Sequence, residues 1–93
     1  MKELQEQFIG RGQVKGFAFT QIEKTASYHI YEVKSEGTKY YEVFKRMENT
    51  RFDCVSYPTN NAFGTWAWTY LDLNKAEDKA DDLELLFETK IGL

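Results

Sequence analysis

Two runs of β-branched and aromatic residues, separated by a turn signal, constrain the fold of this chain more than any other feature. Residues 27–34 read SYHIYEVK and residues 39–47 read KYYEVFKRM, and both compositions are typical of β-strands. The intervening residues 35–38, SEGT, include a glycine that favours a tight turn. The sequence therefore predicts a β-hairpin, and with it an antiparallel sheet.

The register of this hairpin depends on the length of its turn. A three-residue loop over residues 35–37 gives its glycine a left-handed conformation and sets Tyr31 opposite Tyr41. A two-residue turn would set Lys34 opposite Lys39, and like charges directly opposite each other are unfavourable. We therefore expect the three-residue loop. One face of the hairpin would then carry His29, Tyr31, Val33, Tyr41 and Val43, and the other Tyr28, Ile30, Glu32, Tyr40, Glu42 and Phe44.

Alternation of apolar and polar residues predicts further strands on both sides of the hairpin. These strands cover residues 14–22, 51–57 and 65–73, and the second should pair directly with the end of the hairpin. Residues 1–12 are expected to form an N-terminal arm or a short helix, because two glycines interrupt any longer regular structure there.

The pattern changes to helical spacing near residue 74, and an amphipathic helix is predicted over residues 74–90. Asn74 and Glu77 have the spacing of a capping box. The apolar face of this helix consists of Ala76, Ala80, Leu83 and Phe87. Strands followed by a helix indicate an α+β fold. We expect one domain, residues 1–93, with an antiparallel meander sheet of about five strands in residues 13–73 and the C-terminal helix packed on one face.

Length and composition exclude several classes of protein. The 93 residues carry a net charge of −3, and the single cysteine excludes an internal disulfide framework or a multi-cysteine zinc site. No secretory signal or membrane-length apolar run is visible, so we expect a cytoplasmic protein without a membrane partner. Residues 72–93 hold seven acidic and three basic side chains, whereas the rest of the chain is nearly neutral, so the acidic total does not exclude an anionic ligand on the sheet.

Few residues are candidates for chemistry. A small enzyme would have to use His29 as a general base oriented by Glu32 or Glu42, and no motif supports that arrangement. Cys54 lies in an alternating segment and is expected to be a small buried apolar residue. We therefore expect no enzyme activity, no catalytic residue, no metal and no cofactor.

The aromatic residues are spread over both faces of the predicted sheet and exceed what one helix can cover. An interaction module that binds a protein partner, or a second copy of itself, is therefore the leading hypothesis, with Phe63 in the loop at residues 59–64 as an anchor. Single-stranded nucleic acid is the alternative ligand, because rings alternate with basic residues on the sheet. The candidate binding residues are Tyr28, Tyr40, Phe44, Phe63, Arg46 and Arg51.

Overall fold

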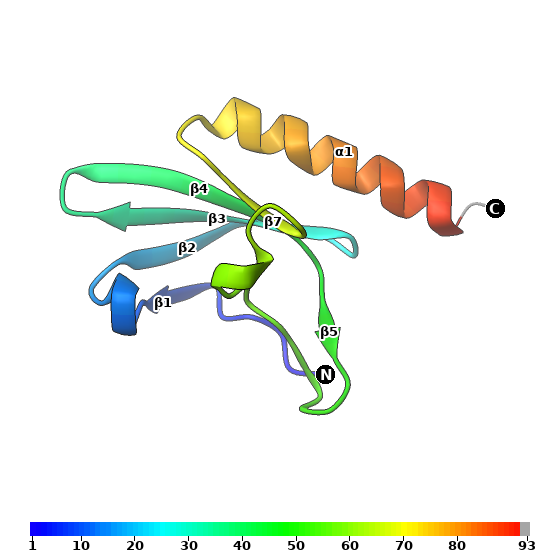
Figure 1. Cartoon of the computed structure of the whole chain (residues 1–93), viewed down its shortest axis with the longest axis horizontal. Helices are drawn as coiled ribbons and strands as arrows, with labels where there is room; N and C mark the ends of the chain where they lie inside the picture. Colours follow the sequence, from blue (N-terminus) through cyan, green and yellow to red (C-terminus); the bar gives the residue numbers. More distant parts are fainter. Residues whose placement is uncertain (92–93) are drawn as a thin grey trace.

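The structure is a computed structural model that describes residues 1–91 as a five-stranded antiparallel sheet and a long helix (Figure 1). The sheet order is β1-β2-β3-β4-β7, and every neighbouring pair is antiparallel. These elements are β1 (Gln7–Ile9), β2 (Ala18–Lys24), β3 (Tyr28–Ser35), β4 (Thr38–Lys45), β7 (Ala67–Tyr70) and the helix α1 (Leu73–Ile91). The predicted α+β class, the five-stranded sheet and the C-terminal helix are confirmed.

The turn between β3 and β4 has two residues, so the predicted three-residue loop and its register are wrong. Lys34 lies opposite Lys39, and Gly37 in the turn has a φ of 67°. The Lys34 Nζ atom is 3.5 Å from a carboxylate oxygen of Glu32, and its side chain is largely exposed. Like charges in water cost about 1 kcal/mol or less. A one-residue slip, in contrast, would turn every buried side chain of β4 to the other face.

This register assigns each face of the hairpin a different set of side chains from the predicted one. Residues of β4 that were expected beside Tyr31 lie instead beside Tyr28 and Ile30, facing the helix. Phe44 and Glu42 lie on the opposite face, with Tyr31. The helix-facing core consists of Tyr28, Ile30, Tyr41, Val43, Ala76, Ala80 and Leu83.

Both ends of the sheet differ from the prediction. Residues 1–12 contain the edge strand β1 in place of the predicted arm or short helix. The Tyr31 hydroxyl donates to the Gln5 carbonyl oxygen at 2.6 Å and so fixes the segment before this strand to the sheet. Residues 51–57 do not join the sheet. Their part β6 (Cys54–Val55) pairs with β5 (Glu48–Asn49) in a small ribbon that extends from the sheet near the N-terminus (Figure 1).

The ribbon has a local physical cause. Asp53 has a φ of 51°, which bends the chain between β5 and β6, and the neighbouring Phe52 is exposed. The N-terminal segment then bonds to the ribbon, since the Lys2 N–H donates to the Asp53 carbonyl oxygen at 2.9 Å. The place beside β4 that was expected for residues 51–57 is taken by β7, and β1 adds a strand at the opposite edge of the sheet, next to β2.

The predicted strand at residues 14–22 begins four residues later, and the helix begins earlier than predicted. The 3-10 turn η1 (Gly12–Val14) precedes β2, and Gly16 with a φ of 84° completes the connection. At the helix, the Asn74 N–H donates to the Asp72 carboxylate at 2.8 Å. Asp72 is therefore the N-cap, and the capping box expected at Asn74 is absent. Ala76 and Ala80 are buried and allow the helix to approach the sheet closely.

Candidate functional site

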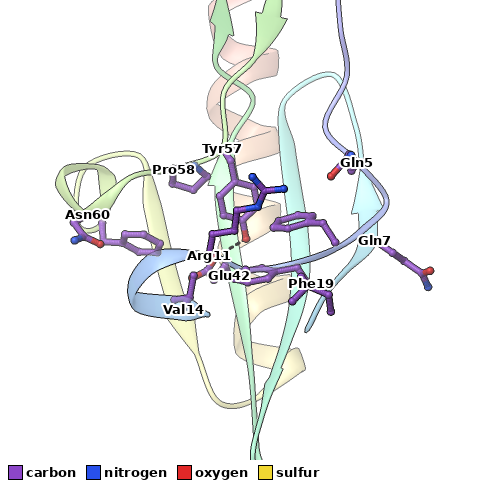
Figure 2. A pocket seen from close by; sticks show the side chains of 13 residues that line it. Gln5, Gln7, Arg11, Val14, Phe19, Glu42, Tyr57, Pro58 and Asn60 are labelled. Carbon is purple, nitrogen blue, oxygen red and sulfur yellow. Dashed lines mark hydrogen bonds between the residues drawn. The ribbon is translucent and has the colours of Figure 1, made fainter. Parts of the chain in front are cut away.

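The sheet face opposite the helix carries an open pocket of about 790 Å³ (Figure 2). The N-terminal segment from Gln5 to Val14 forms one side, and the segment from Tyr57 to Phe63 forms another. Phe19 of β2 and Glu42 of β4 contribute from the sheet. Ligand pockets usually measure about 300–1,000 Å³, so this volume suits a small molecule or a projecting side chain.

Gly10 shapes the N-terminal side of the pocket. A Cβ atom at this position would lie 2.4 Å from the Val14 carbonyl oxygen and 2.9 Å from the ring of Phe19. The Gly10 N–H donates to the Phe17 carbonyl oxygen at 2.8 Å, which closes the loop over the start of β2. Only glycine permits this close approach of two backbone segments.

The opposite side of the pocket is a compact loop around the 3-10 turn η2 (Asn60–Ala62). Pro58 is buried before this turn, and the Thr65 hydroxyl donates to the Ala62 carbonyl oxygen at 2.8 Å after it. Phe63 follows the turn directly and is half-buried against the aromatic face of the sheet. The loop is thus held by its own hydrogen bonds and presents Phe63 to the pocket.

Glu42 is the ionisable side chain that the sheet contributes to this pocket. Its residue exposure is 8%, and the Tyr57 hydroxyl donates to Oε1 at 2.5 Å (Figure 2). Within residues 1–91, no Lys, Arg or His nitrogen lies within ion-pair distance of this carboxyl group. Burial raises the pKa of Glu42, and the Tyr57 hydrogen bond opposes that rise only in part.

Aromatic rings surround the carboxyl group. Phe8 and Phe19 are stacked with their centroids 4.6 Å apart, and the Tyr57 ring meets both edge-on, at 5.4 and 5.7 Å. Tyr57 also contacts Phe44 at 5.0 Å, which ties it to the centre of the sheet. Edge-to-face packing of this kind holds the Tyr57 ring in place and aims its hydroxyl at Glu42. Burial and the nearby Glu42 carboxylate raise the pKa of Tyr57, which therefore stays a hydrogen-bond donor.

The opening of the pocket is polar. Gln5, Gln7 and Asn60 lie at its edge, and each is exposed. Arg11 lines the same pocket, is exposed, and in Figure 2 its side chain extends across the view of the opening. The site thus combines an apolar aromatic interior, one buried carboxyl group and an edge of hydrogen-bonding side chains.

The structure does not bring the predicted ring platform together. Tyr28 is buried beneath the helix, and Phe44 is fully buried on the opposite face. Tyr40 shares the Phe44 face and is half-buried. The expected exposed surface of these three rings is therefore absent, because the actual register separates them and the chain itself covers two of them. Phe63 is the predicted ring residue that lines the pocket.

The two predicted basic binding residues also lie apart. The Arg46 guanidinium donates to both carboxylate oxygens of Glu3, at 2.6 and 2.7 Å, and its Nε donates to Glu48 at 3.1 Å. Arg51 is exposed in the β5–β6 turn and lies over the ring of Phe52, 5.3 Å from the centroid. Arg46 is thus occupied by carboxylates, and Arg51 is remote from the residues that line the pocket.

His29 is fully buried and lines neither the Glu42 pocket nor any of four smaller pockets of the described residues. Its ring stacks on Phe44, with centroids 5.3 Å apart, and neither ring nitrogen has a hydrogen-bond partner in residues 1–91. Burial, aided by the positive charge of Arg46, lowers the pKa of His29 to about 4. Glu32 faces the helix side and Glu42 the pocket, so the proposed grouping of His29 with either carboxylate does not form an accessible site.

Sequence reasoning missed most of the pocket. Phe8, Arg11, Phe19 and Tyr57 were not among the predicted binding residues, although all four line it. Glu42 was considered as a partner of His29 and not as a binding residue. The available signal was a carboxylate within the aromatic run at residues 40–44, which in the correct register lies on a buried aromatic face.

Metal, thiol and membrane features add little to the site. Within the described chain, no three His, Cys, Asp or Glu side chains gather closely enough to hold a metal ion. Cys54 is half-buried and lines a second pocket with Lys2 and Leu4. No helix within residues 1–91 has the length and apolar character needed to cross a membrane.

The chain was compared with protein families, with curated proteins and with solved structures. None of these comparisons finds a match. The pocket around Glu42 is therefore interpreted from its own geometry.

Proposed function

We propose that this protein is a small, non-enzymatic interaction module that captures a projecting group of a partner in the Glu42 pocket. The observation that carries this proposal is the buried carboxyl group of Glu42 at the centre of an open, ring-lined cavity. A buried charged group without a cation lowers the stability of the fold, and such groups are typical of ligand-binding and active sites.

The composition of the pocket supports binding in preference to catalysis. Among the described residues that line it there is one carboxyl group, and there is no His, Cys, Ser or Lys side chain. General acid–base or nucleophilic chemistry needs a second group within hydrogen-bond reach of the first. Tyr57 is within reach of Glu42, and its raised pKa makes the hydroxyl a hydrogen-bond donor to that carboxylate and not a base or a nucleophile.

A nuclear magnetic resonance screen of small organic fragments against the 15N-labelled full chain tests this function. We expect fragments to shift the amide signals of Gln7, Arg11 and Asn60 at millimolar concentration. The variant Asn60→Trp, which places a ring at the pocket edge, should remove these shifts. Asn61→Trp is the matched control, because Asn61 is exposed in the same turn and does not line the pocket. A screen in which no fragment shifts these signals would contradict the proposal.

A further inference from the structure

The second oxygen of the Glu42 carboxyl group lacks a donor within residues 1–91. Oε1 accepts from the Tyr57 hydroxyl, and none of the side-chain hydrogen bonds or ion pairs of the described residues reaches Oε2. Oε2 is not among the fully enclosed side-chain atoms that lack a partner, and Glu42 is one of the residues that line the pocket. A carboxylate has about four acceptor positions, so Oε2 can accept a hydrogen bond from an occupant of the cavity.

The rings around Glu42 favour a positively charged occupant. Phe8, Phe19, Tyr57 and Phe63 all line the pocket. An aromatic face carries negative electrostatic potential and attracts a cation within about 6 Å of its centroid. A carboxylate and several rings therefore act in the same direction, and both disfavour an anion.

We infer that the Glu42 pocket receives a primary alkylammonium group, whose N–H donates to Oε2 while its carbon chain lies against the rings. This inference rests on the proposed function and names the chemistry of its ligand. A primary ammonium is preferred to a quaternary one because only the primary group can donate a hydrogen bond to the carboxylate. A charge-assisted bond of this kind is about twice as strong as a neutral one.

Arg11 modulates this preference without reversing it. Its guanidinium is a like charge to the ammonium and lies at the exposed edge, where salt screens it. The same guanidinium suits a carboxylate on the outer part of a ligand. The ligand class is thus an alkylammonium, from either a free amine or the side chain of a lysine in a partner protein.

A series of four-carbon probes isolates the head group. Butylammonium, butyltrimethylammonium, butanol and butyrate share one apolar body and differ in charge and in hydrogen-bond donors. Titration of the labelled full chain at pH 7 should give butylammonium at least about tenfold tighter binding than butanol, because both can donate a hydrogen bond to the carboxylate but only the ammonium adds an opposite charge. Butyrate should bind more weakly than butanol. Two peptides with blocked ends, one with lysine and one with norleucine at the same position, then separate a protein source from a free amine.

Two variants test the role of the carboxylate. Glu42→Gln keeps the shape and an acceptor for Tyr57 and should remove the preference for butylammonium over butanol. Tyr57→Phe keeps the ring but removes the donor that favours ionised Glu42, so it should weaken butylammonium binding at pH 7 and leave butanol binding nearly unchanged. Glu32→Gln is the control, because this carboxyl group belongs to β3 on the helix side and pairs with Lys34.

The outcomes separate the two proposals. Butanol, butyrate or butyltrimethylammonium binding as tightly as butylammonium would overturn the inference of a primary alkylammonium, while the pocket would remain a binding site. A preference for butylammonium that survives Glu42→Gln would also overturn it. The absence of pocket shifts with every probe would overturn both proposals. If the lysine peptide binds and the norleucine peptide does not, a partner lysine is supported; binding of free butylammonium without binding of the lysine peptide supports a free amine.

Discussion

Glu42 is the residue at which stability and binding conflict most directly. Its carboxyl group is buried, and the pKa is raised in the folded state relative to the usual 4.5. The folded protein therefore holds this proton at pH values where the unfolded chain has lost it. The stability from the protonated form is present below about pH 4.5 and is lost as the pH rises through the folded pKa.

Glu42→Gln should therefore raise the free energy of unfolding at pH 7, by about 1 kcal/mol. Urea unfolding of the variant and the wild type measures this difference. It should shrink below pH 4.5, where the Glu42 side chain of the wild type is protonated and as neutral as the glutamine of the variant. Glu32→Gln, which removes an ion-paired and less buried carboxylate, should not stabilise the protein. A Glu42→Gln variant that is less stable than the wild type at pH 7 would show that the charged form is favoured by the fold.

His29 predicts a pH dependence at mildly acidic pH. Burial lowers its pKa to about 4, against the usual 6.5. Above pH 6.5 His29 is neutral in both the folded and the unfolded state and does not affect the pH dependence of stability. Between pH 6.5 and 4 the unfolded chain takes up a proton that the folded protein does not. This difference corresponds to about 3 kcal/mol of stability lost by pH 4.

The variant His29→Leu isolates that effect, because leucine has a similar volume and does not titrate. Free energies of unfolding, measured at intervals from pH 7 to pH 4, should fall more steeply for the wild type than for the variant. The other titrating groups, including Glu3 and Glu42, are present in both proteins and cancel in the comparison. Parallel curves would show that the His29 pKa is not lowered.

The start of the helix is stabilised by the side chain of Asp72. Asp72 accepts a hydrogen bond from the Asn74 N–H, which satisfies one of the free donors at the helix start. Its negative charge also lies at the favourable end of the helix dipole. Residue spacing alone favoured Asn74 as the cap; the backbone enters the helix earlier because Leu73 packs against the helix-facing core.

Asp72→Ala should lower the free energy of unfolding by about 1 kcal/mol. Asn74→Ala is the comparison, since Asn74 lies inside the helix and its substitution should cost less than that of Asp72. Thermal unfolding followed by circular dichroism distinguishes the two. Equal losses for both variants would assign the capping role to both positions.

The strands divide into those that local pattern could predict and those that it could not. β3 and β4 were predicted because alternation and the turn signal agree over many residues. The edge strand β1 has three residues, and its pairing with β2 comes from contacts such as the Phe8–Phe19 stack. Short segments of this kind carry too few side chains for their periodicity to be recognised.

At the scale of the whole molecule, a bidentate ion pair joins the chain start to the end of β4. Arg46 holds Glu3 through two hydrogen bonds, and the pKa of Glu3 is lowered to about 2 by Arg46. This contribution to stability is present above the usual Glu3 pKa of 4.5 and is lost as the pH falls toward 2. The contact also positions the segment that leads into β1 and the pocket.

Arg46→Gln should loosen that segment more than the rest of the sheet. Hydrogen exchange of the β1 amides and of the Gly10 amide should accelerate, whereas the amides of β3 and the helix should change little. Binding of pocket ligands should weaken in parallel, because Gln5 and Phe8, which line the pocket, follow Glu3 closely in the same segment. Uniformly faster exchange across the whole sheet would instead assign a global role to Arg46.

The helix and the N-terminal segment together account for the aromatic content of the chain. The helix covers one face, and β1 with the loop around Phe63 covers much of the other. The surplus of rings that first indicated an external partner is thus largely buried within the molecule, and the part that remains accessible lines the Glu42 pocket.

The α+β class, the central hairpin and the amphipathic helix follow from local sequence alone, because each depends on a periodicity that many neighbouring residues share. The hairpin register, the β1 edge and the pocket are evident only once the chain is folded in three dimensions. The observed register accepts a small repulsion between the exposed Lys34 and Lys39 because it buries the apolar side chains of β4. The energy of that burial depends on the neighbouring strands and the helix, which only the assembled sheet supplies. The pocket joins Glu42 to Arg11 and Tyr57, residues from distant parts of the chain, so no local pattern contains it.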